Sequence, residues 1–262
     1  MRDPLERLDS AGFIETGVDA RQVQACFQPI LDAIGDSVDD DVAVYVYGSV
    51  ATGRARVGHS DVDVVALGMD PTHARLLGRE LSSEYAAVTR EVAIGAWSPD
   101  DLTDGDAGYG NRIFLKHYCA WLSGPDPAAS LPRFRGDARA ARGFNGDFAA
   151  VVTRWSAAVG SLSDDRPDEI AALARRIGRK SLFAVAGMVS VHDAIWTTDR
   201  ATGAARWAEL HPELADDLAL LLAWGDGVVR ADHHAVARLM RSTVPELISQ
   251  FASHIGAWGE AS

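Results

Sequence analysis

Two acidic residues separated by a single position carry the strongest chemical signal in this chain. Asp61 and Asp63 lie in the segment 60–65, where apolar residues alternate with them. Side chains alternate along a strand, so both carboxylates would point to one face while Val62 and Val64 point into a core. Carboxylates this close repel each other unless a cation lies between them, and Mg²⁺ bound by carboxylates and substrate phosphates is a common solution. The pair therefore predicts a magnesium site, with a solvated strand end as the alternative.

A glycine and a serine precede this pair and predict a phosphate-binding turn. Gly48 and Ser49 follow the apolar strand expected over residues 42–47. Glycine lets the backbone approach a phosphate closely, since any Cβ there would crowd it. The Ser49 hydroxyl and nearby amides can bind phosphate oxygens, and Ser60 is a candidate for orienting Asp61. The alternative is a simple turn glycine with two surface serines.

Together the two motifs resemble the signature of the DNA polymerase β-like nucleotidyltransferase superfamily, in which Gly-Ser follows the first core strand and Asp-x-Asp opens the second. The resemblance implies a third carboxylate on the next core strand, and Glu91 in the apolar run 86–97 is the match. A buried, unpaired acid would be costly, and a metal or a substrate proton would explain it. The alternative is a sheet-edge acid paired with Arg90.

The resemblance also implies the chemistry. AMP would pass from ATP to an acceptor hydroxyl with release of pyrophosphate, and Asp61, Asp63 and Glu91 would hold two Mg²⁺ ions. Glu91 would also take the proton from the hydroxyl. Relatives carry an arginine four residues after the glycine, where this chain has Thr52. Arg54 or Arg56 could replace that arginine.

Hydrophobic periodicity predicts the elements that position these residues. The order helix, strand, strand, helix, strand indicates an α/β (α+β) fold with a small mixed sheet and helices packed on one side. Asp104 to Gly110 is expected to form an irregular loop. The predicted elements are a helix at 23–34, strands at 42–47 and 60–67, a helix at 74–85, a strand at 86–97 and a helix from 111 to 122.

The C-terminal half has only helical patterns and predicts a separate bundle. We place a nucleotidyltransferase domain at 1–140 and a helical substrate-binding domain at 141–262, with Pro245 interrupting the last helix. The segments 179–190, 198–200 and 205–208 resemble the streptomycin/spectinomycin-type aminoglycoside adenylyltransferases. Lys180 belongs to a basic cluster on the long helix that either binds nucleotide phosphates or is a solvated helix face. The resemblance implies that Arg200 binds nucleotide phosphates and that Asp168 binds the acceptor, although an acid at a helix start is also explained by the helix dipole. The predicted helices span 148–159, 167–191, 198–210, 212–224 and 232–257.

Composition limits the partners. A net charge of −12 argues against extended nucleic-acid binding and suits a small, cationic acceptor, an aminoglycoside antibiotic being one candidate. No apolar run approaches a membrane span, and the N-terminus lacks a hydrophobic signal core, which predicts a cytoplasmic protein. Cys26 and Cys119 lie in helical patterns and are expected to be buried thiols.

The leading hypothesis is therefore a Mg²⁺-dependent adenylyltransferase acting on a small hydroxylated molecule. One alternative keeps the chemistry but modifies a protein or RNA partner, as antitoxin-like relatives do. Another is a nucleotide-binding module without turnover, although such a module has no physical reason to keep three mutually repelling carboxylates. The sequence predicts neither the oligomeric state nor the nucleotide preference.

Overall fold

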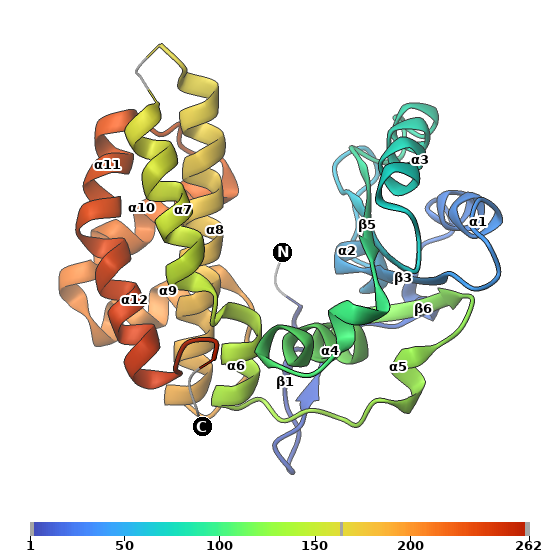
Figure 1. Cartoon of the computed structure of the whole chain (residues 1–262), viewed down its shortest axis with the longest axis horizontal. Coiled ribbons are helices and arrows are strands. Elements are labelled where there is room, and N and C mark those ends of the chain that lie inside the picture. Colours follow the sequence, from blue (N-terminus) through green and yellow to red (C-terminus); the bar gives the residue numbers. More distant parts are fainter. Residues whose placement is uncertain (1–2, 163–164, 260–262) are drawn as a thin grey trace. The chain divides into compact units, whose positions relative to one another are not determined.

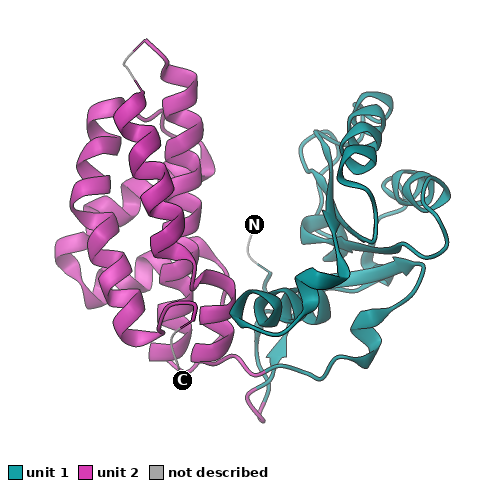
Figure 2. Cartoon of the chain, in the orientation of Figure 1, with its two compact units in different colours: residues 1, 3–9, 13–134 teal, residues 2, 10–12, 135–262 magenta. Residues whose placement is uncertain are grey.

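The computed structural model describes residues 3–162 and 165–259 of the chain and divides it into two units (Figure 2). Unit 1 comprises residues 3–9 and 13–134, and unit 2 comprises residues 10–12 and the chain from 135 onward. The division lies between Phe134 and Arg135. The predicted domain boundary at residue 140 falls inside α6 (Ala138–Asn145).

A four-stranded mixed sheet forms the centre of unit 1 (Figure 1). Its strand order is β5-β4-β3-β6, so β4 lies between the two strands expected to carry the Gly-Ser turn and the third acid. The β3–β4 and β3–β6 pairs are antiparallel, and the β4–β5 pair is parallel. The strands are β3 (Ala43–Tyr47), β4 (Val62–Leu67), β5 (Val92–Trp97) and β6 (Cys119–Ser123).

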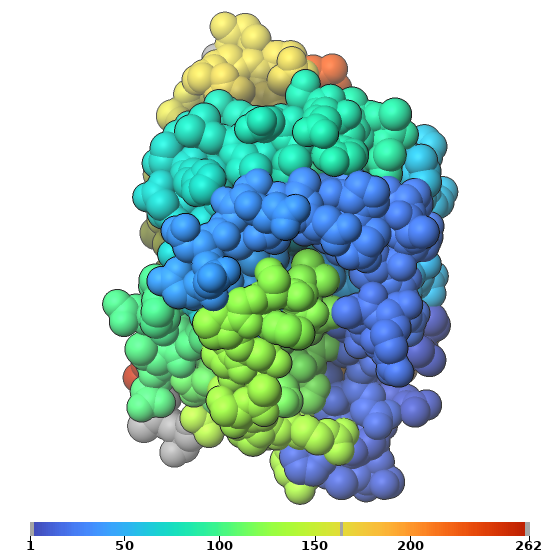
Figure 3. All heavy atoms as spheres, turned by 90° about the vertical axis from the view of Figure 1, so that its right-hand side faces the viewer, coloured from blue at the N-terminus to red at the C-terminus, as the bar shows by residue number. Residues whose placement is uncertain are grey.

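Side-chain alternation gives this sheet two apolar faces. Val62 and Val64 are fully buried on the face that packs against α1 (Gln28–Asp36) and α3 (Pro71–Glu84). Figure 3 shows α1 in blue and α3 in teal next to each other on this side of unit 1. Tyr45, Val65 and Leu115 of α4 (Asp106–Tyr118) pack together on the opposite face. Helices thus cover both faces, and the expectation of helices on one side only is wrong.

Local signals set where the long helices of unit 1 begin. The Asp70 carboxylate accepts hydrogen bonds from the amides of Thr72 and His73, each at 2.9 Å, and so caps α3. Pro29 lies in the first turn of α1, where its missing N–H costs nothing. The shorter elements of unit 1 are β1 (Arg7–Leu8), β2 (Ile14–Glu15), η1 (Ala20–Gln22), α2 (Gly48–Ala51), η2 (Pro99–Leu102) and α5 (Pro127–Ser130).

Several predicted boundaries are wrong because tertiary packing overrides local pattern. The helix expected from Val23 begins only at Gln28, which leaves Cys26 exposed outside it. The segment expected to be a loop at 104–110 belongs largely to α4, and the end of the predicted helix at 111–122 is β6. Cys119 is buried as predicted, but in a strand that pairs with β3.

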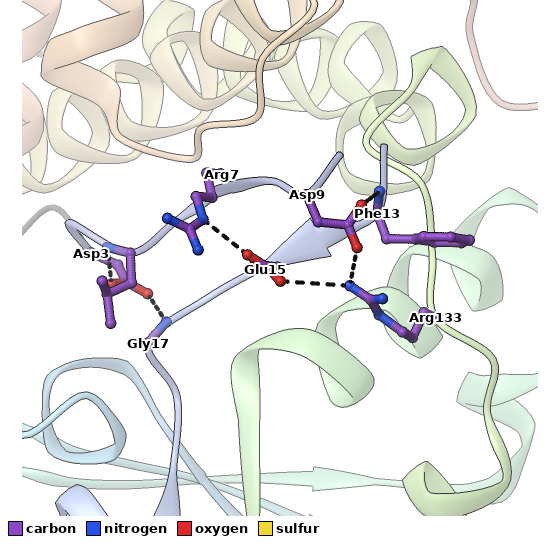
Figure 4. A network of polar contacts seen from close by, with 8 residues as sticks. Asp3, Arg7, Asp9, Phe13, Glu15, Gly17 and Arg133 are labelled. Carbon is purple, nitrogen blue, oxygen red and sulfur yellow. Dashed lines mark hydrogen bonds and ion pairs between the residues drawn. The ribbon is translucent and has the colours of Figure 1, made fainter. Parts of the chain in front are cut away.

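A short hairpin, β1 paired with β2, was not predicted, and ion pairs hold it to the end of unit 1. Arg7 Nε donates to Glu15 Oε2 at 2.9 Å across the hairpin (Figure 4). Arg133 donates to Asp9 Oδ2 at 2.7 Å and lies 3.9 Å from Glu15 Oε1. The first and last segments of unit 1 are thereby joined.

Unit 2 is a helical bundle around one apolar core, as predicted. Trp207 is fully buried in it, and its indole N–H donates to Gln250 Oε1 at 2.9 Å. The last predicted helix is divided at Ser242, so Pro245 lies in the first turn of the new helix and does not break one. Besides α6, the unit contains α7 (Phe148–Ser161), α8 (Pro167–His192), α9 (Arg200–Leu210), η3 (Pro212–Leu214), α10 (Ala215–Asp226), α11 (His233–Arg241) and α12 (Thr243–His254). Among the described residues, none of the helices combines the length and apolar character needed to cross a bilayer.

His117 on α4 makes the stability of unit 1 depend on pH. Its Nε2 accepts the Phe134 amide at 2.9 Å, and burial, with the charges of Arg133 and Lys116, lowers its pKa from 6.5 to about 4. Between these two values the unfolded chain takes up the proton and the folded chain does not. Stability from this group is therefore complete above pH 6.5 and falls as pH drops toward 4.

We expect His117→Gln, which keeps a hydrogen-bond acceptor, to flatten this part of the pH profile. The measurement is the urea unfolding free energy of both proteins at intervals between pH 7 and pH 4. Other acids contribute equally to both proteins, so the difference curve isolates His117. Parallel curves would contradict the assignment.

Candidate active site

The Gly-Ser turn begins where β3 ends, and its glycine adopts a backbone conformation that other residues avoid. Gly48 has φ of +70° and starts α2. A Cβ placed on it would lie 3.0 Å from Asp63 Oδ2. The Ser49 carbonyl accepts the Arg54 amide at 2.8 Å, which closes the turn. The backbone at Gly48 thus lies directly against a carboxylate.

Strand register brings the two aspartates to this turn. Asp63 pairs with Tyr47 across the antiparallel β3–β4 ladder, so it lies beside the end of β3. Because Val62 and Val64 are buried on the α1 and α3 face, Asp61 and Asp63 point to the other face. This is the arrangement that the Asp-x-Asp spacing predicts.

A pocket of about 350 Å³ collects most of the predicted residues of unit 1. Arg54 lies in this pocket and follows the turn in the sequence. Its Nε is buried and has no hydrogen-bond partner among the described residues. An unpaired buried donor is costly unless a ligand satisfies it. Arg56, the other suggested substitute for the missing arginine at position 52, does not line the pocket. The lining residues are Gly48, Ser49, Thr52, Arg54, His59, Ser60, Asp61, Asp63 and Arg90.

Arg90 is the cation that balances these carboxylates. Its Nε donates to Asp61 Oδ1 at 2.8 Å, and its Nη2 donates to Asp61 Oδ2. This hydrogen bonding and the charge of Asp61 raise the pKa of Arg90, and the charges of Glu91 and Asp63 add to the effect. One guanidinium therefore interacts with all three acids that the sequence singles out.

Glu91 lies beside Asp61, immediately before β5. Val62 pairs with Val92 in the parallel ladder, and the Val62 amide donates to the Glu91 carbonyl at 2.9 Å. Glu91 is exposed, so the sequence argument from the cost of a buried acid is wrong. The alternative of a pair between Glu91 and Arg90 also differs from the structure, in which Arg90 hydrogen bonds to Asp61. The Glu91 side chain lines a second pocket, of about 680 Å³, rather than the first.

Ser60 and Tyr47 complete the surroundings. The Ser60 hydroxyl accepts a hydrogen bond from the Arg56 amide at 2.9 Å, and the Ser60 carbonyl accepts one from the Arg90 amide at 3.1 Å, so Ser60 holds the loop before β4 in place.

Tyr47 was not predicted from the sequence and lines the second pocket with Glu91. Burial raises the pKa of Tyr47, with a further contribution from the charge of Asp63, which keeps its hydroxyl a proton donor. The signal available in the sequence was its position at the end of the predicted strand, directly before Gly48.

The three predicted residues of unit 2 each have a partner within that unit. Lys180 Nζ donates to Asp147 Oδ1 at 2.6 Å. Arg200 Nη2 donates to Asp226 Oδ1 at 3.0 Å, and Arg230 Nη2 donates to Asp168 Oδ1 at 2.7 Å. The structure therefore gives each a local ion pair.

The donor set of unit 1 fits a hard divalent cation. Among the described residues, no three His, Cys, Asp or Glu side chains are arranged to hold a metal by themselves. Mg²⁺, however, binds through one or two carboxylates and completes its shell with water and substrate phosphates. Asp61 and Asp63, on one face and beside a turn with free space, meet this requirement.

Two glycines of similar backbone conformation provide a test of the contact between Gly48 and Asp63. Gly58 has φ of +72°, and a Cβ there would come no closer than 4.0 Å to the Ala87 carbonyl. Gly58→Ala should cost only the left-handed backbone penalty, about 1 to 2 kcal/mol. Gly48→Ala should lose more stability in urea unfolding, because it must also displace the Asp63 carboxylate. Equal losses would show that this carboxylate moves away freely.

Comparison with known proteins agrees with this geometry. The family model described as a nucleotidyltransferase domain matches residues 30–97, which include the Gly-Ser turn, both aspartates and Glu91. No curated protein matches the chain. The α/β core with a helical region after it is confirmed. Residues 30–97 of this chain are therefore similar to a nucleotidyltransferase domain, the kind of domain that the motifs of the sequence resemble.

Proposed function

We propose that this protein transfers AMP from ATP to a hydroxyl group of a small acceptor and releases pyrophosphate. One observation carries the proposal: the Gly48–Ser49 turn and the carboxylates of Asp61 and Asp63 line a single pocket, with the Gly48 backbone against Asp63. A turn suited to binding phosphate would then lie beside two carboxylates suited to binding a hard cation. The match of residues 30–97 to a nucleotidyltransferase domain supports the same reaction class.

The turn and Arg54 would bind the triphosphate. Gly48 offers backbone without a Cβ, and Ser49 offers a hydroxyl and an amide at the start of α2. Arg54 offers a guanidinium with an unpaired Nε in the same pocket. Charge-assisted hydrogen bonds of this kind are about twice as strong as neutral ones. Arg54 would thus take the role of the arginine that relatives carry at position 52.

Asp61 and Asp63 would hold Mg²⁺, with Glu91 close to them on the next strand. A bound divalent ion would neutralise charge on the phosphates and on the attacking oxygen. Asp61 would have to share its carboxylate with the ion or release Arg90. The Arg90 side chain is 65% exposed, so water can hydrogen bond to its guanidinium if the ion displaces it from Asp61.

Glu91 would act as the general base. The acceptor oxygen attacks the α-phosphorus, and its proton passes to the Glu91 carboxylate. The bond between the α-phosphorus and the bridging oxygen breaks, and pyrophosphate leaves with the bonding electrons. Glu91 is exposed, beside Asp61 and on the rim of the larger pocket, so an acceptor can reach it.

Lys180 and Arg200 as phosphate ligands, and Asp168 as an acceptor ligand, stay predictions. Each would have to leave its partner in unit 2 to bind a substrate. The Arg230–Asp168 pair is the most exposed and would open most readily, whereas Lys180 is 18% exposed and also lies 3.3 Å from the Phe144 carbonyl. An aminoglycoside acceptor is likewise a prediction.

The deciding experiment incubates the protein with labelled ATP, Mg²⁺ and a panel of hydroxylated small molecules, and follows pyrophosphate and acceptor mass. We expect Asp63→Ala to abolish transfer while keeping the fold, and Glu91→Gln to keep ATP binding while transfer falls at least a hundredfold.

Incorporation of the label into a cellular protein or RNA, and not into a small molecule, would favour the antitoxin-like alternative. ATP binding without pyrophosphate release would favour a noncatalytic nucleotide-binding module.

Arg54 gives a separate prediction with a matched control. Loss of a charged hydrogen bond costs about 1.5 to 3 kcal/mol, so Arg54→Gln should raise the KM for ATP roughly ten- to a hundredfold. Arg56→Gln removes the same charge two positions away, from an exposed side chain that does not line the pocket. Its KM should stay within twofold of the wild-type value. A similar rise in both variants would mean that only general charge matters.

A further inference from the structure

The pocket that Glu91 lines also contains two arginines, which the net charge of the chain does not predict. We call it the β5–α3 pocket, since residues of β5 and α3 line most of it. Figure 1 shows these two elements next to each other. The volume of the pocket is about 680 Å³. Six of its residues carry the argument: Tyr47, Arg75, Arg79, Ser82, Glu91 and Ile94.

Two arginines give this pocket its positive charge. Arg75 and Arg79 are one helical turn apart on α3, so they lie on one face of that helix. Neither makes a hydrogen bond or an ion pair with any of the described residues. In a chain with 37 acidic and 25 basic residues, two adjacent guanidinium groups without acidic partners are unexpected. Planar guanidinium groups bind phosphate and carboxylate through paired hydrogen bonds.

The edge of β5 adds a backbone donor. The Glu91 and Trp97 carbonyls accept hydrogen bonds from the amides of Val62 and Gly68, at the two ends of β4. Odd-numbered residues along β5 therefore hydrogen bond to β4, and the amides of even-numbered residues point away from it. Accordingly, the Val92 amide donates to Ser82 Oγ at 2.8 Å. The next outward amide is that of Ile94, which has no partner in residues 3–162 or 165–259.

The same pocket contains the groups that would act on an acceptor hydroxyl. Glu91 lines it, and so does Tyr47, whose hydroxyl has no hydrogen-bond partner within the described residues. The Gly-Ser turn and Arg54 line the other pocket, so the triphosphate does not need Arg75 or Arg79. One pocket is suited to the nucleotide phosphates and the other to a second anionic molecule.

We propose that the β5–α3 pocket binds the acceptor and that this acceptor is a hydroxyl compound carrying a phosphate or carboxylate group. Arg75 and Arg79 bind the anionic group, and the hydroxyl lies at Glu91. This proposal rests on the proposed nucleotidyl transfer and names its substrate class. It also argues against a polycationic acceptor in this pocket, because the lining has two guanidinium groups and one carboxylate, that of Glu91, and the two guanidinium groups would repel a polycation at close range.

The test compares Arg75→Gln/Arg79→Gln with Arg154→Gln/Arg241→Gln, a control that removes two exposed arginines of unit 2. Isothermal titration measures binding of ribose 5-phosphate, gluconate, ribose and the aminoglycoside kanamycin. We expect ribose 5-phosphate or gluconate to bind the wild type and the control, and at least tenfold more weakly to the Arg75/Arg79 variant. The two anionic probes decide between phosphate and carboxylate. The Kd for ATP should stay within twofold in all proteins.

Other outcomes separate this proposal from the proposed function. No binding of either anionic probe, equal binding in both double variants, or preference for kanamycin or ribose would overturn the anionic acceptor site. Arginine-dependent probe binding without pyrophosphate release from any acceptor would uphold the site while contradicting nucleotidyl transfer. Pyrophosphate release that is insensitive to Arg75 and Arg79 would uphold transfer and contradict the site.

Discussion

The approach of the Gly48 backbone to the Asp63 carboxylate is the constraint on which the site depends. It exists because the β3–β4 register places Tyr47 opposite Asp63, so that the chain leaves β3 next to the acid. That register is fixed from the other face, where Val62 and Val64 are fully buried. A slip by one residue would turn both aspartates into the core. Core packing on one face of the sheet therefore determines where the carboxylates lie on the other face.

Charge in this protein is organised locally. The chain carries a net charge of −12, yet Arg54, Arg90 and the pair Arg75 and Arg79 line the two pockets around the three acids. Arg90 compensates the carboxylates from an exposed position, through two hydrogen bonds to Asp61. Net charge influences long-range attraction, whereas a bound ligand responds to the few groups within a Debye length. The pocket lining is thus a better guide to the acceptor than composition.

Unit 2 shows how far a local motif can be interpreted. Its helical pattern predicted a bundle, and the bundle is present around a single apolar core. Lys180, chosen from a basic helix cluster, and Arg200 and Asp168, chosen by resemblance, each form an ion pair inside the unit. Sequence spacing identifies a residue type and a helix face, but the partner comes from another helix far along the chain.

The sequence by itself determined the α/β core, the helical C-terminal region and the Gly48–Ser49 turn facing Asp61 and Asp63, because strand parity and glycine chemistry are local properties. Only the tertiary structure decided the rest. The pairing of β6 with β3 turned a predicted helix end into a strand, and the parallel β4–β5 ladder left Glu91 exposed rather than buried. Tyr47, Arg75 and Arg79 meet Glu91 in one pocket because β5 packs beside α3. Such contacts join separate elements, and no periodicity within one segment encodes them.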